Sequence, residues 1–252
     1  MRVEGSVALV TGANRGLGRS FAATLLEAGA RTVYAGVRDP SSVSDTRLVP
    51  VRLDVTDPAL VAAAAERCAD VDIVINNAGV MRASPFIAAS STDGAHDEMA
   101  VNYFGMLNVC RAFAPVLDHN GGGAIVNMLS AASWVTPAAT GSYAASKAAA
   151  WALTNGVRVE LRSQGTLVVA VHAGFIDTDM AARVHVAKLD PDDVAQMVVD
   201  ALRSGTEEVL ADDETRAIKS ALPHALETLY PPIQARWDER HPRRPSQPSQ
   251  PS

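Results

Sequence analysis

The chain contains very few cysteines, only Cys68 and Cys110 among its 252 residues. Two cysteines in a chain of this size cannot build the disulfide framework of a small secreted domain. Both fall in segments with helical, largely apolar patterns, so we expect buried free thiols. The histidines show no metal-ligand spacing, and no metal site is predicted.

Long apolar runs and an excess of basic residues are also missing. No apolar stretch approaches the ~20 residues that a transmembrane helix needs, and the segment from Met1 to Glu4 has no signal-peptide pattern. We therefore expect a cytoplasmic protein without a membrane partner. The net charge is −6, whereas nucleic-acid binding needs a basic surface, so nucleic acid is not an expected partner. A Gly-x-Ser-x-Gly sequence, typical of serine hydrolases, does not occur.

The remaining composition is that of one globular domain. With 48% apolar and 20% charged residues, the chain has enough apolar side chains for an ample core. We place a single domain at residues 1–239. Residues 240–252 are rich in proline, serine and glutamine and too polar to pack, which predicts a disordered tail.

Strand-like apolar runs alternate with helical patterns along most of the chain. This alternation is typical of a doubly wound parallel sheet of the Rossmann type, here with about seven strands and with helices on both faces. Strands are expected at 6–11, 32–37, 48–53, 71–76, 123–129, 166–172 and 207–211, and helices at 17–29, 58–68, 92–118, 143–163, 191–204 and 212–228. The second crossover, at 39–45, has room for only one or two helical turns.

A glycine-rich turn joins the first predicted strand to the first predicted helix. The sequence Thr11-Gly12-Ala13-Asn14-Arg15-Gly16-Leu17-Gly18 directly follows the apolar run 7–10. Such glycines let the backbone approach a pyrophosphate, which the N-terminus of the helix then faces. The spacing differs from the standard Gly-x-Gly-x-x-Gly fingerprint, so the turn alone does not identify a dinucleotide site.

Tyr143 and Lys147 stand four residues apart in a predicted helix, and therefore on one face of it. A nearby ammonium favours phenolate, which should lower the pKa of the tyrosine from about 10 toward neutrality. Such a tyrosine can give or take a proton. Ser130 precedes Tyr143 by thirteen residues, and Asn102 lies further upstream. Alone, each of these residues also fits a structural role; their combination points to catalysis.

These segments together resemble the short-chain dehydrogenase/reductase family over roughly residues 5 to 215. The matches are the glycine loop, Asn76-Asn77-Ala78-Gly79, Asp54 with Val55, and the tetrad Asn102, Ser130, Tyr143 and Lys147. The resemblance implies a nicotinamide-dependent oxidoreductase that interconverts carbonyl and alcohol groups. It implies cofactor contacts for Gly12, Asn14, Arg15, Gly16, Leu17, Gly18, Asp54, Val55, Asn77, Ala78, Gly79, Tyr143, Lys147, Gly174, Ile176 and Thr178.

The resemblance also implies the catalytic roles. Tyr143 would be the general acid in carbonyl reduction, with Lys147 lowering its pKa and holding the nicotinamide ribose. Ser130 would bind the substrate oxygen, and Asn102 would support a water linked to Lys147. Ala173 stands where the family has a proline, which leaves this strand exit less rigid.

The cofactor is expected to be NADPH rather than NADH. Asp39 lies about twenty residues after the glycines, where an acid often holds a ribose 2′-hydroxyl. In NAD-preferring relatives, however, the acid ends the second strand, and Val37 stands there. Arg38 follows at once, and the resemblance implies that it and Arg15 bind the 2′-phosphate, which suits guanidinium groups.

Apolar residues after the later strands are candidates for the substrate pocket, namely Ala132, Trp134, Phe175 and Met180. With no arginine to clamp an anion, they favour a neutral, moderately hydrophobic ketone or aldehyde. The helices 92–118 and 143–163 would pair with another copy, by resemblance, in a homodimer or homotetramer. Three alternatives remain: an NAD-dependent alcohol dehydrogenase, a noncatalytic NADP-binding regulator, and a lyase of related fold that would lack the nucleotide loop.

Overall fold

A seven-stranded parallel sheet forms the centre of the molecule, in the order β3-β2-β1-β4-β5-β6-β7. The computed structural model describes residues 1–241. The strands are β1 (Val7–Thr11), β2 (Thr32–Val37), β3 (Val49–Arg52), β4 (Ile73–Asn76), β5 (Gly123–Met128), β6 (Thr166–His172) and β7 (Glu208–Leu210). The Rossmann-like, doubly wound sheet predicted from the sequence is confirmed, and each strand lies where it was expected.

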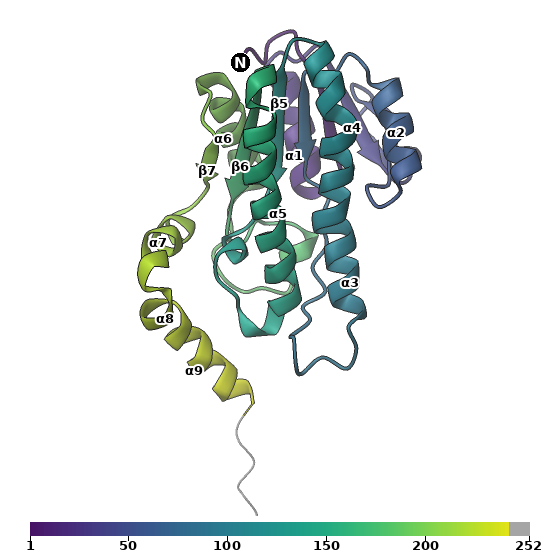
Figure 1. The fold of residues 1–252 in the computed structure, drawn as a ribbon. Helices are drawn as coiled ribbons and strands as arrows, with labels where there is room; N and C mark the ends of the chain where they lie inside the picture. The colour runs from purple at the N-terminus through teal and green to yellow at the C-terminus, as the bar shows by residue number, and fades with distance from the viewer. Residues whose placement is uncertain (242–252) are drawn as a thin grey trace, which may run out of the picture.

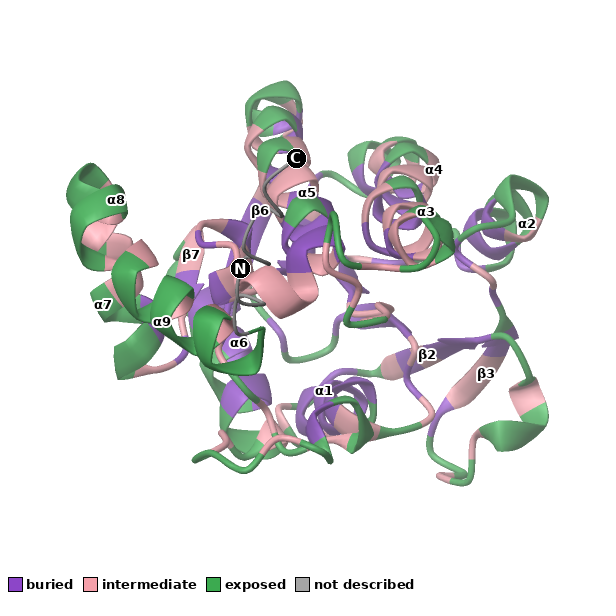
Figure 2. Ribbon diagram, turned by 90° about the horizontal axis from the view of Figure 1, so that it is seen from below, coloured by how far each residue is buried: buried purple, intermediate pink, exposed green. Residues whose placement is uncertain are grey.

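Helices cover both faces of this sheet. They are α1 (Gly16–Glu27), α2 (Pro58–Arg67), α3 (Asp93–Met99), α4 (Met106–His119), α5 (Gly141–Glu160), α6 (Pro191–Ser204), α7 (Asp213–Ala221), α8 (Ala225–Thr228) and α9 (Tyr230–Arg240). In Figure 2, α1 and α6 lie on one side of the sheet, and α2, α4 and α5 lie on the other. Figure 1 shows α7, α8 and α9 continuing as an arm beyond the lower edge of the sheet.

The sheet is buried on both faces, so its strands are continuously apolar rather than alternating with polar residues. In β1, Ala8 and Val10 belong to the core under α1 and α6. Val7 and Leu9 belong to the core under α2, α4 and α5. Cys68 and Cys110 are buried free thiols in the second core, as expected.

Helix starts follow local capping chemistry. The Asp57 carboxylate accepts from the backbone N–H groups of Ala59 and Leu60, and Pro58 occupies the first turn of α2. Asp190 caps α6 with the same arrangement, followed by Pro191. The short second crossover contains a single 3₁₀ turn, Pro40–Ser42, as predicted.

Three helix predictions need correction. The helix expected at 92–118 is interrupted by a π-helical segment, Ala100–Gly105, between α3 and α4. The helix expected at 212–228 divides into α7, a 3₁₀ turn at Leu222–His224 and α8. Helix α9 was not predicted, and it runs through Arg240, where the tail was expected to begin. The rest of that tail, from residue 242, lies outside the described residues.

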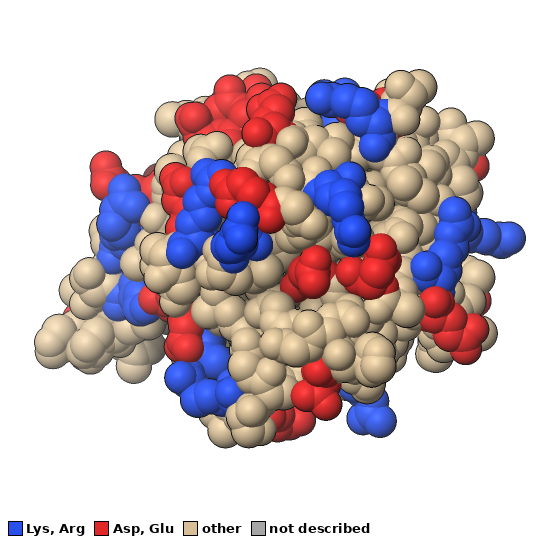
Figure 3. Space-filling model, turned by 90° about the horizontal axis from the view of Figure 1, so that it is seen from above, with Lys and Arg blue, Asp and Glu red and all other residues tan. Residues whose placement is uncertain are grey.

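At the end of the molecule where the strands begin, the surface has no large patch of one charge sign. Figure 3 shows acidic and basic side chains interspersed over this end. Within residues 1–241, no helix combines the length and apolar character needed to cross a bilayer. The predicted pairing of α4 and α5 with another copy stays a prediction.

Candidate active site

A cavity of about 610 Å³ opens at the carboxyl ends of the central strands. Its walls come from the β1–α1 loop, from the chain after β2, β3, β4, β5 and β6, and from the first turns of α5. In an open parallel sheet this crevice is the expected place for a ligand. Within the described part of the chain, no group of three His, Cys, Asp or Glu residues could hold a metal ion.

The glycine loop forms one end of the cavity, and two of its glycines are required by geometry. A Cβ on Gly18 would lie 2.1 Å from the carbonyl oxygen of Gly12, so no larger residue fits. Gly12 has a φ of +69°, which other residues rarely adopt. Thr11 Oγ1 accepts from the backbone N–H groups of Asn77 and Ala78, both at 3.0 Å. The loop is thereby fixed to the end of β4.

The structure brings together all the residues predicted to hold the cofactor. Those that line the cavity are Gly12, Asn14, Arg15, Gly16, Leu17, Gly18, Arg38, Asp54, Val55, Asn77, Ala78, Gly79, Tyr143, Lys147, Gly174, Ile176 and Thr178. We call the end of the cavity lined by the glycine loop the cofactor cradle; a Cβ at Gly18 would collide there with the backbone of Gly12 and with Asn77. These residues would hold a dinucleotide, for whose pyrophosphate the start of α1 is suited.

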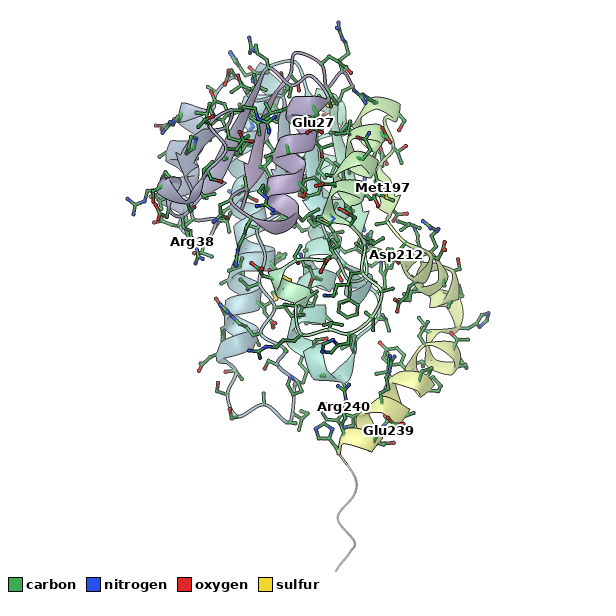
Figure 4. All side chains as sticks on the ribbon, turned by 180° about the vertical axis from the view of Figure 1, so that it is seen from behind. Glu27, Arg38, Met197, Asp212, Glu239 and Arg240 are labelled. Atoms are coloured by element: carbon green, nitrogen blue, oxygen red, sulfur yellow. The ribbon has the colours of Figure 1, made fainter. Side chains whose placement is uncertain are left out.

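The two arginines predicted for the 2′-phosphate have different surroundings. Arg38 is exposed at the end of β2, at the margin of the cavity, where Figure 4 labels it. Within residues 1–241 it takes part in no ion pair. Arg15 instead bonds Asp179 across the cavity mouth, with Nη1 3.0 Å from Oδ2. Arg38 is therefore the more accessible cation.

The acids near Arg38 are already engaged. Asp39 accepts from the backbone N–H and the hydroxyl of Ser41, at 3.0 and 2.7 Å, and these bonds lower the pKa of its carboxyl. Burial raises the pKa of Asp54, but bonds from Thr56 and the charge of Arg38 outweigh it and keep the carboxyl below its ordinary value. Asp39 therefore caps a turn instead of reaching for a ribose.

Tyr143, Lys147 and Ser130 meet at the other end of the cavity. The Lys147 side chain is only 4% exposed, and its Nζ donates to the Met128 carbonyl oxygen at 2.8 Å. Nζ lies 5.9 Å from the centroid of the Tyr143 ring. Burial lowers the pKa of Lys147 to about 8.

The expected lowering of the tyrosine pKa is not what the geometry produces. Burial raises the pKa of Tyr143 to about 12, hydrogen bonding by Ser130 acts in the opposite direction, and the charge of Glu98 adds to the rise. Desolvation disfavours the charged form of each group. The sequence spacing correctly placed ammonium and phenol on one face, but it contained no information on how deeply both are buried.

Asn102 lies behind the cavity rather than in its wall. Its Oδ1 accepts from the backbone N–H of Val80 at 2.8 Å, and its Nδ2 donates to Val80 O and to Ser146 Oγ, both at 2.9 Å. It belongs to the π-helical segment, a type of local widening often found at functional sites. Its predicted support of a water near Lys147 stays a prediction.

The chain after β6 is held by a residue that the sequence analysis treated only as the start of a helix. Asp212 Oδ2 accepts from the backbone N–H of Gly174 at 2.8 Å, and Oδ1 accepts from Thr215 N–H, which caps α7. Figure 4 shows Asp212 where β7 leads into α7. This contact anchors the strand exit at which Ala173 replaces the family proline. The only sequence signal was an acid ahead of a helix.

The predicted substrate residues separate into two groups. Phe175 and Met180 line the cavity and are 41% and 46% exposed. Trp134 and Ala132 are not among the lining residues, and Trp134 instead stacks on His172 with ring centroids 3.8 Å apart. Val80, Met81 and Val101 also line this part of the cavity. No motif in the sequence around Val80 or Val101 predicted that these two residues would line it.

Known proteins similar to this chain are described as dehydrogenases or oxidoreductases. The family described as short chain dehydrogenase matches residues 6–188. An uncharacterised oxidoreductase of Staphylococcus saprophyticus is 30% identical over 223 residues, covering 81% of this chain and 93% of that protein. A 1-deoxy-11-beta-hydroxypentalenate dehydrogenase of Streptomyces avermitilis is 34% identical over 194 residues, covering 71% of this chain and 72% of that one.

Solved structures share the fold over nearly the whole chain. A short chain dehydrogenase from Burkholderia cenocepacia, in complex with NADP, is 43% identical with a TM-score of 0.88, and the match covers 92% of this chain and 99% of that one. A gluconate 5-dehydrogenase from the same species, in complex with NADP and tartrate, is 27% identical with a TM-score of 0.75 and covers 83% and 94%.

Proposed function

The chain belongs to the short-chain dehydrogenase family and is a nicotinamide-dependent oxidoreductase, and we propose that it reduces a neutral, moderately hydrophobic ketone or aldehyde with NADPH. The observation that carries the proposal is the convergence of Ser130, Tyr143 and Lys147 on one end of a cavity whose other end is the glycine loop. A proton donor thus faces the place where a carbonyl would meet the cofactor.

Arg38 supports NADPH as the cofactor. The guanidinium is accessible at the cavity margin beyond β2, while Asp39 is occupied by Ser41. A fixed fork of N–H donors suits a phosphate better than a ribose hydroxyl. Two similar solved structures are complexes with NADP, which agrees with this assignment.

The chemistry divides between the cofactor and the protein. NADPH, when bound, supplies the hydride to the carbonyl carbon. Tyr143 donates its phenolic proton to the carbonyl oxygen, and the Ser130 hydroxyl hydrogen-bonds the same oxygen and stabilises the charge that develops there. Lys147, held by the Met128 carbonyl, keeps a positive charge beside the phenol and would hold the nicotinamide ribose.

The substrate class follows from the side chains around the reacting end. Val80, Met81, Phe175 and Met180 are apolar. Lys147, at the reacting end, is engaged by the Met128 carbonyl. The other charged residues that line the cavity belong to the cofactor end or the cavity mouth, namely Arg15, Arg38, Asp39, Asp54 and Asp179. Apolar walls reward burial of hydrocarbon surface at about 25 cal/mol per Å². They offer no partner for a carboxylate or phosphate group.

The test is NADPH oxidation against a panel of aryl, aliphatic and cyclic ketones, with Tyr143→Phe as the variant. Phenylalanine keeps the ring but has no proton to donate, so turnover should fall by about a hundredfold or more. NADPH binding, followed by fluorescence, should weaken far less, because the other cofactor contacts remain. Turnover by Tyr143→Phe equal to that of the unmodified protein would refute the assignment.

A further inference from the structure

Glu98 is a fully buried acid next to the helix of the catalytic tyrosine, and the proposed chemistry does not use it. Its side chain is 0% exposed. Oε1 accepts from the backbone N–H of Arg82 at 2.6 Å, and Oε2 forms a hydrogen bond with Ser142 Oγ. A buried carboxyl is costly unless such bonds satisfy it, so these two contacts define its place.

The contacts of Glu98 repeat those of Asn102, one helical turn earlier in the chain. Asn102 joins the backbone of Val80 to the hydroxyl of Ser146. Glu98 joins the backbone of Arg82 to the hydroxyl of Ser142. The two side chains thus form parallel bridges from one helical face to the segment after β4 on one side and to α5 on the other.

Each bridge ends on the residue directly before a catalytic one. Ser142 precedes Tyr143 and Ser146 precedes Lys147 in α5. Val80, which the first bridge fixes, lines the reacting end of the cavity. The second bridge therefore holds the start of the catalytic helix against the segment that leads away from the cavity wall.

The segment that Glu98 holds is strained. Ala83 has a φ of +52°, the only such value outside glycine in the described chain, and this left-handed conformation is unfavourable for a residue with a Cβ. On one side of it Arg82 N–H bonds Glu98, and on the other Ser84 O accepts from Ser142 N–H at 3.1 Å. Strain of this kind persists only where neighbours fix the backbone.

We infer that Glu98 is a positioning residue for the proposed reduction, which ties the strained segment 80–84 to Ser142 and thereby sets Tyr143 against the cavity wall. Gly94, one turn before Glu98, packs against the same segment, since a Cβ there would lie 3.1 Å from Ser84 Cβ and 3.2 Å from Arg82 Cβ. The inference rests on the proposed function, because it acts through Tyr143.

The experiment compares Glu98→Gln with Glu98→Met. Glutamine can still accept from Arg82 N–H and donate to Ser142 Oγ, as the Asn102 amide does toward Val80 and Ser146. Methionine has a similar length but makes neither bond at full strength. We expect kcat within about threefold of the unmodified protein for Glu98→Gln, and a loss of about tenfold or more for Glu98→Met.

Asp97→Asn is the matched control, because Asp97 is a neighbouring acid that pairs with the exposed Arg82 guanidinium. It should leave kcat unchanged. NADPH binding should stay within twofold in all variants, since Glu98 contacts no cofactor-binding residue of the glycine loop. Ser142→Ala removes the other half of the bridge without a large cavity, and it should lower kcat in the same direction even if Glu98→Met folds poorly.

The outcomes separate the inference from the proposed function. If the unmodified protein reduces no carbonyl, the proposed function fails, and the thermal midpoint then tests the bridge separately. Glu98→Met should lower the midpoint and Glu98→Gln should keep it, and equal midpoints in the two variants would overturn the bridge. If the unmodified protein is active but Glu98→Met and Ser142→Ala keep its kcat, the inference is overturned. It is equally overturned if Glu98→Gln loses as much as Glu98→Met.

Discussion

Replacing Arg38 by alanine should change the balance between the two nicotinamide cofactors. Arg38 lies at the cavity margin directly after β2, exposed and without an ion pair in the described chain, so its guanidinium is free to meet a 2′-phosphate. NADH carries a hydroxyl at that position. The substitution should therefore weaken NADPH and leave NADH nearly unchanged.

The magnitude follows from the kind of bond that is lost. A hydrogen bond to a charged group contributes about 1.5–3 kcal/mol, which corresponds to a factor of about 10 to 150 in affinity. Because Arg38 is exposed, solvent and salt screen the interaction, and we expect the lower end, about tenfold. The loss should shrink as the ionic strength is raised.

Arg15→Ala provides the comparison. Arg15 is already paired with Asp179 at 3.0 Å, and the two side chains are 70% and 79% exposed. Exposed pairs contribute at most about 1 kcal/mol, but Arg15 must leave this partner to reach a phosphate. Its removal should therefore weaken NADPH by about threefold, less than removal of Arg38.

The assay is the Kd of each cofactor by fluorescence titration, followed by kcat/KM with NADPH and NADH on the same ketone. A selectivity ratio that falls about tenfold in Arg38→Ala and less in Arg15→Ala is the expected result. An equal loss for NADPH and NADH in Arg38→Ala would refute the assignment, because a contact shared by both cofactors cannot be the 2′-phosphate.

Two further predictions concern the reacting end. His172 Nδ1 lies 3.1 Å from the carbonyl oxygen of Ser130 and must donate to it, which helps to hold Ser130 in place. His172→Asn can keep this donor, so its kcat should stay within about threefold of the unmodified protein, whereas the kcat of His172→Gln should fall further. Equal kcat values for the two variants would contradict a role of His172 in holding Ser130. Burial lowers the pKa of Lys147 to about 8, so its charge is present below that pH and lost above it. The kcat for reduction should accordingly fall as the pH rises through about 8, and a flat profile to pH 10 would contradict this. His172, whose pKa burial lowers to about 4, should add no step between pH 5 and 9.

The strands and the cofactor cradle could be predicted from the sequence because local patterns determine them. Apolar runs bounded by turns mark strands that are buried on both faces, and Gly12 and Gly18 stand where the backbone needs them. The interruption between α3 and α4 could not be predicted, since residues 100–105 continue an ordinary helical pattern. Within this turn Asn102 contacts Val80 and Ser146, which are distant in the sequence.

Long-range contacts explain the remaining differences. Trp134 was expected at the substrate because it follows β5, but it turns away and stacks on His172 from the neighbouring strand β6. Asp212 holds Gly174 across a separation of 38 residues, and Glu98 reaches Ser142 across 44. No periodicity or motif in one sequence reports which side chains meet over such distances.

The burial of the catalytic pair also bears on the direction of the reaction. With its pKa raised to about 12, Tyr143 keeps its proton throughout the physiological range. Reduction needs that protonated phenol as a general acid, whereas oxidation of an alcohol needs the phenolate as a base. Lys147 stays charged below about pH 8 and favours the transfer without removing the proton beforehand. The same desolvation opposes the low tyrosine pKa expected from the sequence and agrees with the proposed role of Tyr143 as a proton donor. We therefore expect carbonyl reduction to be faster near neutral pH and alcohol oxidation to be faster under alkaline conditions, where the phenol begins to ionise.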